Sequence, residues 1–288
     1  MGSRAFCSRT TQVQGLLASS NSAERGAPVL DRLQPAGQDR PGLKRAVQRV
    51  LQHTLGLHAY LDLFARYRLL SSRWDSRDAA FRAFLGRLPQ EGLVLDIGAN
   101  VGVLTVQLAR RVRRGTVHAF EPTPSSHDAA RRLVNRLGLA NVVLHPWALG
   151  RTKGEVEMVM PVSAAVRQHG LSHVVGSADD TTPGDRFRVP CRALDEMHEW
   201  FEPGARVTGI KLDVEDYEAE VLEGGRRLLA THRPLVYCEL WLTPNRDRTV
   251  ALMRELGYGA MAFRRGAVEP FDPVPHASDQ DFFFVPPA

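Results

Sequence analysis

The chain has 288 residues, 43% of them hydrophobic and 24% charged, which is the composition of an ordinary soluble globular protein. No window approaches the roughly 18 apolar residues that a membrane-spanning helix needs, and this excludes a membrane-spanning protein. The three cysteines, Cys7, Cys191 and Cys238, lie far apart and form no CxxC pair. They argue against a disulfide framework or a zinc site, and a reducing cytoplasm is the expected location.

The basic residues behind the formal net charge of +5 are nearly all arginine. Four of them cluster within residues 110–114, where we expect a helix to end and where cations stabilise the negative end of the helix dipole. No aromatic residues interleave with these arginines, as they would in a site that stacks bases. We therefore expect neither nucleic acid nor a membrane among the partners.

The first 90 residues precede the main domain. Residues 1–41 are rich in Ser, Gly, Gln and Arg without sustained periodicity, and we predict a flexible leader there. Between residues 42 and 90, apolar side chains recur at helical spacing, among them Val47, Val50, Phe81 and Phe84. We predict that residues 42–90 form a helical extension or cap on a domain that occupies residues 91–288.

Beyond Gly92 the chain alternates apolar strands with helices, which predicts βαβ crossovers and a parallel sheet with helices on both faces. Two later segments read as strands with no helix between them, and we expect them to form an antiparallel pair at the sheet edge. The predicted strands are 93–97, 116–121, 141–145, 207–213, 234–240, 259–263 and 281–285. The predicted helices are 101–114, 125–138, 217–230 and 246–256.

An insertion over residues 151–200 interrupts this rhythm. Its segments GEVEMVM and FRVPC alternate like hairpin strands and flank a polar stretch, so we expect a hairpin with a substrate loop. His169 and His173 lie four apart within it but lack the HExxH pattern, and we predict no metal site. His173 is kept as a candidate catalytic residue because the insertion is expected to touch the substrate.

The motif LVLDIGANVG places a glycine turn between the first predicted strand and helix. Gly98 and Gly102 would let backbone approach a ligand there. A nicotinamide fingerprint requires glycine at positions 100 and 103, which are Asn100 and Val103 in this chain. Asp96 would repel a pyrophosphate but suits a cation, and S-adenosylmethionine (SAM) carries both a sulfonium and an ammonium group.

A second acid supports the same cofactor. The next predicted strand, within GTVHAFEP, ends in Glu121, and an acid at this distance after the turn can hold both ribose hydroxyls of a nucleoside. Two such features at successive strand ends make SAM the favoured ligand.

Five motifs together resemble those of the FkbM-family methyltransferases. They are VLDIGANVG, HAFEP, IKLDVEDYEAEVLEGG, PLVYCEL and DFFFVP, in family order over residues 75–286. The resemblance implies a Rossmann-like (class I) methyltransferase fold, which is α/β with a mostly parallel seven-stranded sheet whose last strand is antiparallel. It also implies methyl transfer from SAM, typically to a hydroxyl group on a small natural product or sugar.

The resemblance also implies roles for individual residues. The residues around the methionine part of SAM would be Asp96, Gly98, Asn100 and Gly102. Glu121 would take the ribose, and Trp147 and Ala148, in the turn after the third strand, would border the adenine.

Asp213 and Glu215, at the end of the fourth main strand, would face the transferred methyl group. We favour Glu215 as the base and Asp213 as the carboxylate on the cofactor side, because residues that alternate along a strand point to opposite faces. The alternative is that Glu215 caps the following helix. Asp216 stands where the family usually has glycine, which would add a charge at the mouth of the site.

We therefore expect a SAM-dependent O-methyltransferase that acts on a small-molecule hydroxyl acceptor. Two alternatives stay open: a catalytically inactive SAM-fold binding protein, for which Asp216 is the only hint, and an NAD(P)-dependent oxidoreductase. The acceptor's identity and the oligomeric state are left undetermined by the sequence.

Overall fold

The computed structural model describes residues 41–72, 74–176, 180–273, 276 and 278–287, so the predicted leader lies outside it except for residue 41. The chain enters the described part through α2 (Pro41–Ser71), a 3-10 turn η2 (Ser76–Asp78) and α3 (Ala79–Arg87). Gly56 has φ 73° and bends α2 at its middle. Among the described helices, none is both long enough and apolar enough to cross a membrane.

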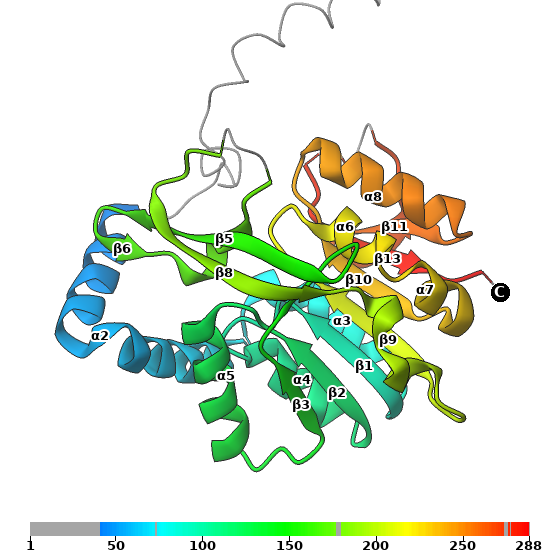
Figure 1. The fold of residues 1–288 in the computed structure, drawn as a ribbon, viewed down its shortest axis with the longest axis horizontal. Coiled ribbons are helices and arrows are strands. Elements are labelled where there is room, and N and C mark those ends of the chain that lie inside the picture. The colour runs from blue at the N-terminus through cyan, green and yellow to red at the C-terminus, as the bar shows by residue number, and fades with distance from the viewer. Residues whose placement is uncertain (1–40, 73, 177–179, 274–275, 277, 288) are drawn as a thin grey trace, which may run out of the picture.

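A large, mostly parallel sheet forms the centre of the protein (Figure 1). Its strand order is β12-β11-β13-β10-β9-β1-β2-β3, and β1 pairs in parallel with both β2 and β9. The strands are β1 (Glu91–Ile97), β2 (Arg114–Phe120), β3 (Val142–His145), β9 (Val207–Leu212), β10 (Leu235–Glu239), β11 (Gly259–Arg264), β12 (Ala267–Pro270) and β13 (Asp281–Val285). The connecting helices are α4 (Val103–Arg111), α5 (Pro124–Arg136), α6 (Glu218–Glu223), α7 (Arg226–His232) and α8 (Pro244–Glu255).

The strands alternate their side chains between two cores, one on each face of the sheet. Leu95 and Ile210 join a core with apolar residues of α6, α7 and α8. Val94 and Val117 point the other way and pack with Phe84 of α3 and residues of α4. Because both faces are covered, the strands read as nearly continuous apolar runs in the sequence. The predicted Rossmann-like α/β fold is confirmed.

The edge of the sheet contains one more strand than we predicted. The last strand, β13, is antiparallel to both β10 and β11, as expected. The sheet has eight strands because β12 adds an antiparallel pair to β11 through a tight turn. Arg265 and Gly266 in that turn have φ values of 50° and 85°. The strand β12 is only four residues long and ends in Pro270, too short for an alternating pattern to indicate it.

The insertion forms a second, smaller sheet centred on an antiparallel hairpin of β5 (Gly154–Ser163) and β8 (Gly184–Arg192). The strands β4 (Ala148–Leu149), β6 (Val166–Arg167) and β7 (His173–Val174) extend it, and the 3-10 turns η3 (His169–Leu171), η4 (Leu194–Glu196) and η5 (His198–Phe201) flank them. At the far end of the hairpin, β6 meets α2 (Figure 1). There Gln52 and Arg167 exchange two hydrogen bonds of 3.0 Å.

Candidate active site

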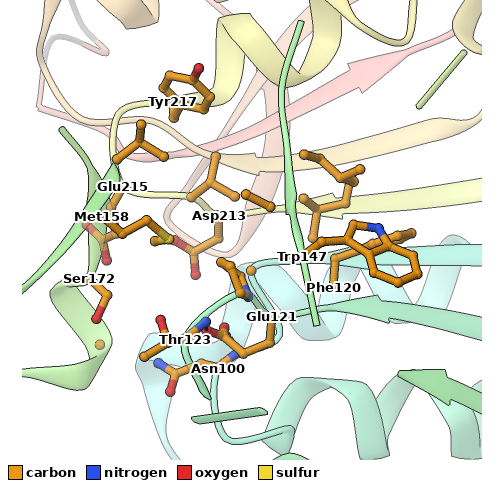
Figure 2. A pocket seen from close by; sticks show the side chains of 18 of the residues that line it. Asn100, Phe120, Glu121, Thr123, Trp147, Met158, Ser172, Asp213, Glu215 and Tyr217 are labelled. Carbon is orange, nitrogen blue, oxygen red and sulfur yellow. Dashed lines mark hydrogen bonds between the residues drawn. The ribbon is translucent and has the colours of Figure 1, made fainter. Parts of the chain in front are cut away.

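A pocket opens at the carboxyl ends of β1, β2 and β9, where ligands bind in open α/β sheets (Figure 2). It encloses about 610 Å³ of empty space, part of it open to solvent. Loops after the strands supply one side, and the insertion supplies the other through Met158, His169, Gly170, Ser172 and Val174. Seven of the predicted site residues line it: Gly98, Asn100, Glu121, Trp147, Ala148, Asp213 and Glu215.

The glycine turn needs its two glycines for packing against other segments as well as for forming the pocket. Gly98 and Gly102 have φ values of 80° and 83°, a region that suits glycine. A Cβ on Gly98 would lie 1.8 Å from the carbonyl oxygen of Asp213, so the backbone after β1 touches the backbone after β9. A Cβ on Gly102 would lie 3.0 Å from the Cβ of Ala130 on α5. Gly102 does not line the pocket; it starts α4 and lets that helix approach α5.

Asp96 lies beneath the pocket rather than in its wall. Its side chain is fully buried, and Oδ2 accepts a hydrogen bond of 2.6 Å from Thr105. Its Oδ1 lies 3.4 Å from the ammonium of Lys211, which is also 3.5 Å from Asp213 Oδ2. Lys211 donates a 2.6 Å hydrogen bond to the carbonyl of Gly98. The ammonium therefore joins the ends of β1 and β9 under the glycine turn.

Sequence reasoning did not single out Lys211, although a signal was present. It is one of three lysines in the chain and lies within an otherwise apolar strand. Burial opposes its charge, but Asp213 and Asp96 hold the pKa of Lys211 above its usual value. A lysine that is 2% exposed stays charged only beside such partners.

Glu121 fixes the loop at the floor of the pocket. Its Oε2 accepts a 2.8 Å hydrogen bond from the backbone N–H of Asn100, and its Oε1 accepts one of 2.8 Å from that of Thr123. Burial raises the pKa of this carboxyl group. Each carboxylate oxygen can accept a further bond from a ligand. Beside it, the buried Oδ1 of Asn100 has no hydrogen-bond partner in the described part of the chain.

Aromatic rings form the opposite end of the pocket. Trp147 and Phe120 both line it there (Figure 2). The Trp147 ring is held by Arg192, whose guanidinium carbon lies 4.1 Å from the ring centroid, and by His145 at a centroid distance of 4.8 Å. Burial lowers the pKa of His145 to about 4, so this ring stays neutral at pH 7. The result is a flat apolar surface of the kind that stacks a planar base.

Asp213 and Glu215 lie together in the pocket wall. We expected strand alternation to separate them, but β9 ends at Leu212 and the loop then turns, with φ 55° at Glu215. Both side chains therefore reach the pocket. Burial raises the pKa of Glu215 well above its usual value, and the charges of Asp213 and Glu239 add to that rise. The N-cap of α6 is Tyr217, so the alternative role of Glu215 as its helix cap does not hold.

Two further acids hold this loop against α8. Asp216 has φ 70°, which explains why glycine suits the position, and the Thr243 hydroxyl donates a hydrogen bond to its side chain. It does not line the pocket, so our expectation of a charge at the pocket mouth was wrong. Glu218 accepts hydrogen bonds from the Val214 N–H at 3.2 Å and from Asn245 Nδ2 at 2.8 Å. Burial raises the pKa of Glu218 to about 8.

The insertion presents a different histidine from the one we singled out. His173 is buried, and its ring nitrogens lie 3.0 Å from the carbonyl of Leu171 and 3.2 Å from Asp180, away from the pocket lining. His169 lines the pocket instead, and its ring packs edge-on against Phe64 of α2 at a centroid distance of 5.0 Å. Burial lowers the pKa of His169 to about 4. Helical spacing did not distinguish the two because they lie in separate short elements.

With this geometry in place, comparison with known proteins identifies the family. Residues 96–259, more than half of the chain, match the model of the methyltransferase FkbM domain. The chain belongs to the FkbM family of SAM-dependent methyltransferases. The match to this family supports SAM rather than a nicotinamide as the cofactor.

Individual relatives are distant. Methyltransferase 1 of Beauveria bassiana is 24% identical over 147 residues, which is 47% of this chain and 59% of the relative. Methyltransferase sdnD of Sordaria araneosa is 26% identical over 166 residues, 49% of this chain and 62% of the relative. The chain thus matches less than two thirds of the length of each. The solved FkbM methyltransferase of Methylobacillus flagellatus is 15% identical with a TM-score of 0.47, over 89% of this chain and 56% of that one.

Proposed function

We propose that this protein transfers the methyl group of SAM to a hydroxyl oxygen on a small molecule such as a sugar or a natural product. Glu215 carries the proposal. It lines the pocket, and its buried Oε2 has no hydrogen-bond partner among the described residues. Such an oxygen is placed to accept a hydrogen bond from an acceptor hydroxyl and then its proton.

The pocket residues fit SAM. Glu121 would hold the ribose hydroxyls on lone pairs that its two backbone bonds leave over. Trp147 and Ala148 would border the adenine, and Gly98, Asn100 and Asp213 would surround the amino acid tail. The bound cofactor supplies a methyl group on a positively charged sulfur, which leaves as a neutral thioether.

Glu215 would make the hydroxyl oxygen a better nucleophile. An alcohol attacks poorly until a base takes its proton, and a carboxylate with a raised pKa is a stronger base than an ordinary glutamate. The proton leaves the hydroxyl for Glu215 as the oxygen forms its bond to carbon. Asp213 shares the ammonium of Lys211, which suits it to a binding role on the cofactor side.

The test is transfer of labelled methyl from SAM to a panel of alcohols and amines, with wild type and Glu215→Gln compared. The amide is nearly isosteric, so SAM affinity should persist while turnover falls by about 10²–10⁴, the usual share of general-base catalysis. Glu155→Gln, at an exposed position of β5, is the matched control and should leave turnover unchanged.

Three outcomes would count against the proposal. If Glu215→Gln leaves turnover intact, Glu215 is not the base. If it weakens SAM binding as well, Glu215 contacts the cofactor, and the roles of Asp213 and Glu215 should be exchanged. Binding of SAM with no labelled product from any acceptor would favour the inactive alternative, and label found on nitrogen alone would replace O-methylation with N-methylation.

A further inference from the structure

The side chains that line the pocket carry charges of only one sign. Glu121, Asp213 and Glu215 are acidic, and the described lining residues include no lysine or arginine. Burial keeps His169, also in the lining, neutral. Figure 2 shows Glu215 and Tyr217 at one end and Trp147 and Phe120 at the other. The end that would receive the acceptor is therefore the more acidic one.

The buried ammonium of Lys211 does not neutralise that end. The ammonium of Lys211 lies below the glycine turn, bonded to the Gly98 carbonyl and shared between Asp96 and Asp213. Glu215 has no such cationic partner among the described residues, and its buried Oε2 has no hydrogen-bond partner among them. Behind it lies Glu239 at the end of β10, where burial and the Asp213 charge raise the pKa of that carboxyl too.

A charge count shows that negative charge around Glu215 is in excess. The carboxyl groups around this end are Asp96, Asp213, Glu215, Glu218 and Glu239, and Lys211 offsets one of them. Bound SAM, with two positive groups and one negative group, offsets a second. The remaining negative charge attracts either protons or a cationic ligand, since like charges in a partly buried site cannot all stay ionised.

We propose that the acceptor is a cationic amino alcohol, such as an amino sugar, whose ammonium group pairs with Glu215 and Asp213 while a neighbouring hydroxyl is methylated. This inference rests on the proposed function. The ammonium keeps Glu215 ionised and so able to take the hydroxyl proton. A phosphate or carboxylate on the acceptor would instead face carboxyl groups with no lysine or arginine to receive it.

Matched cyclic probes test this charge preference directly. Cyclohexanol, 2-aminocyclohexanol and 2-hydroxycyclohexanecarboxylate share a hydroxyl but are neutral, cationic and anionic at pH 7. Their dissociation constants are measured by calorimetry on the protein saturated with S-adenosylhomocysteine. We expect the amino alcohol to bind tightest, and to exceed the hydroxy acid by on the order of 100-fold, as one close ion pair at a protein surface allows.

Two further measurements sharpen the test. In Glu215→Gln the preference for the amino alcohol should shrink at least tenfold, whereas the exposed Glu155→Gln should keep it. With wild type, the acidic limb of kcat, which reports the pKa of Glu215 in the complex with acceptor, should lie at lower pH for the amino alcohol than for cyclohexanol. The charged groups that face Glu215 are Asp213, Glu239 and Glu218, all acidic, so an added ammonium lowers the pKa of Glu215.

Equal or tighter binding of the hydroxy acid, or no preference among the three probes, would overturn the inference. Methyl transfer to neutral alcohols without an ammonium preference would leave the proposed function standing and remove only the charge assignment. Failure to transfer methyl to any alcohol would instead remove the proposed function itself.

Discussion

Glu121 combines a proposed binding role with a visible structural one, because its carboxylate already accepts the N–H groups of Asn100 and Thr123. Glu121→Ala removes the ribose acceptor and loosens the loop that carries Asn100. We expect SAM binding to weaken by about 2–4 kcal/mol, or roughly 30- to 1,000-fold in dissociation constant. Calorimetric titration with SAM measures this, and an unchanged dissociation constant in a folded variant would contradict the ribose assignment.

The backbone of Asp213 requires glycine at position 98 whether or not a ligand is bound. A Cβ would lie 1.8 Å from the Asp213 carbonyl oxygen, so Gly98→Ala must push β1 and β9 apart at their ends. We expect it to cost about 3 kcal/mol or more in the free energy of unfolding, in addition to any loss of SAM binding. Urea unfolding measures that cost.

Gly138→Ala is the matched control for backbone strain. Gly138 also has positive φ (62°), but no atom lies within 4 Å of its built Cβ. Only the left-handed conformation is then penalised, at about 1–2 kcal/mol. Equal costs for the two variants would mean that the approach of Gly98 to Asp213 is not what requires glycine.

At the scale of elements, Lys211 joins the carboxyl ends of two central strands. Lys211→Met keeps the length of the side chain but leaves Asp96 and Asp213 without their ammonium partner. Breaking a buried ion pair in this way costs about 3–5 kcal/mol, and we expect that loss in urea unfolding. Lys153→Met, at an exposed position, should change stability by less than about 0.5 kcal/mol. A Lys211 variant as stable as the Lys153 control would contradict the structural role given to this ammonium.

The sequence predicted the elements better than their contacts. Local patterns predicted the order of the strands along the chain, the glycine turn and the acid at Glu121. They could do so because neighbouring residues determine where a buried strand lies and where it ends. Gly98 touching Asp213 does not follow, since the two are far apart in the chain and only the β1–β9 pairing brings them together. Nor does the sequence predict the place of His169 in the pocket, because its contact with Phe64 joins the insertion to the distant helix α2.

At the scale of the whole molecule, buried acids make stability depend on pH. The pKa of Glu218 is about 8 in the folded protein against 4.5 for an ordinary glutamate, so between these values the folded state holds more protons than the unfolded one. The contribution of Glu218 to the free energy of unfolding is therefore present at low pH and is lost as pH rises toward 8. Without cofactor, we expect the free energy of unfolding to be lower at pH 8 than at pH 6.

Glu218→Gln should remove part of that slope, because the amide resembles the protonated acid and does not titrate. One titrating group can change the free energy of unfolding by at most about 2–3 kcal/mol over two pH units. Urea unfolding at both pH values measures the slope, with the exposed Glu155→Gln as the control that should keep it. A Glu218 variant with the wild-type slope would show that this carboxyl group does not carry the pH dependence.

The division of the pocket into a cofactor end and an acceptor end underlies every role proposed for its residues. A crystal structure of the protein with S-adenosylhomocysteine bound tests it most directly. We expect the ribose hydroxyls on Glu121, the adenine against Trp147, and the thioether sulfur facing the space in front of Glu215. A nucleoside bound at the Glu215 end, or one that leaves Glu121 without a contact, would contradict the account.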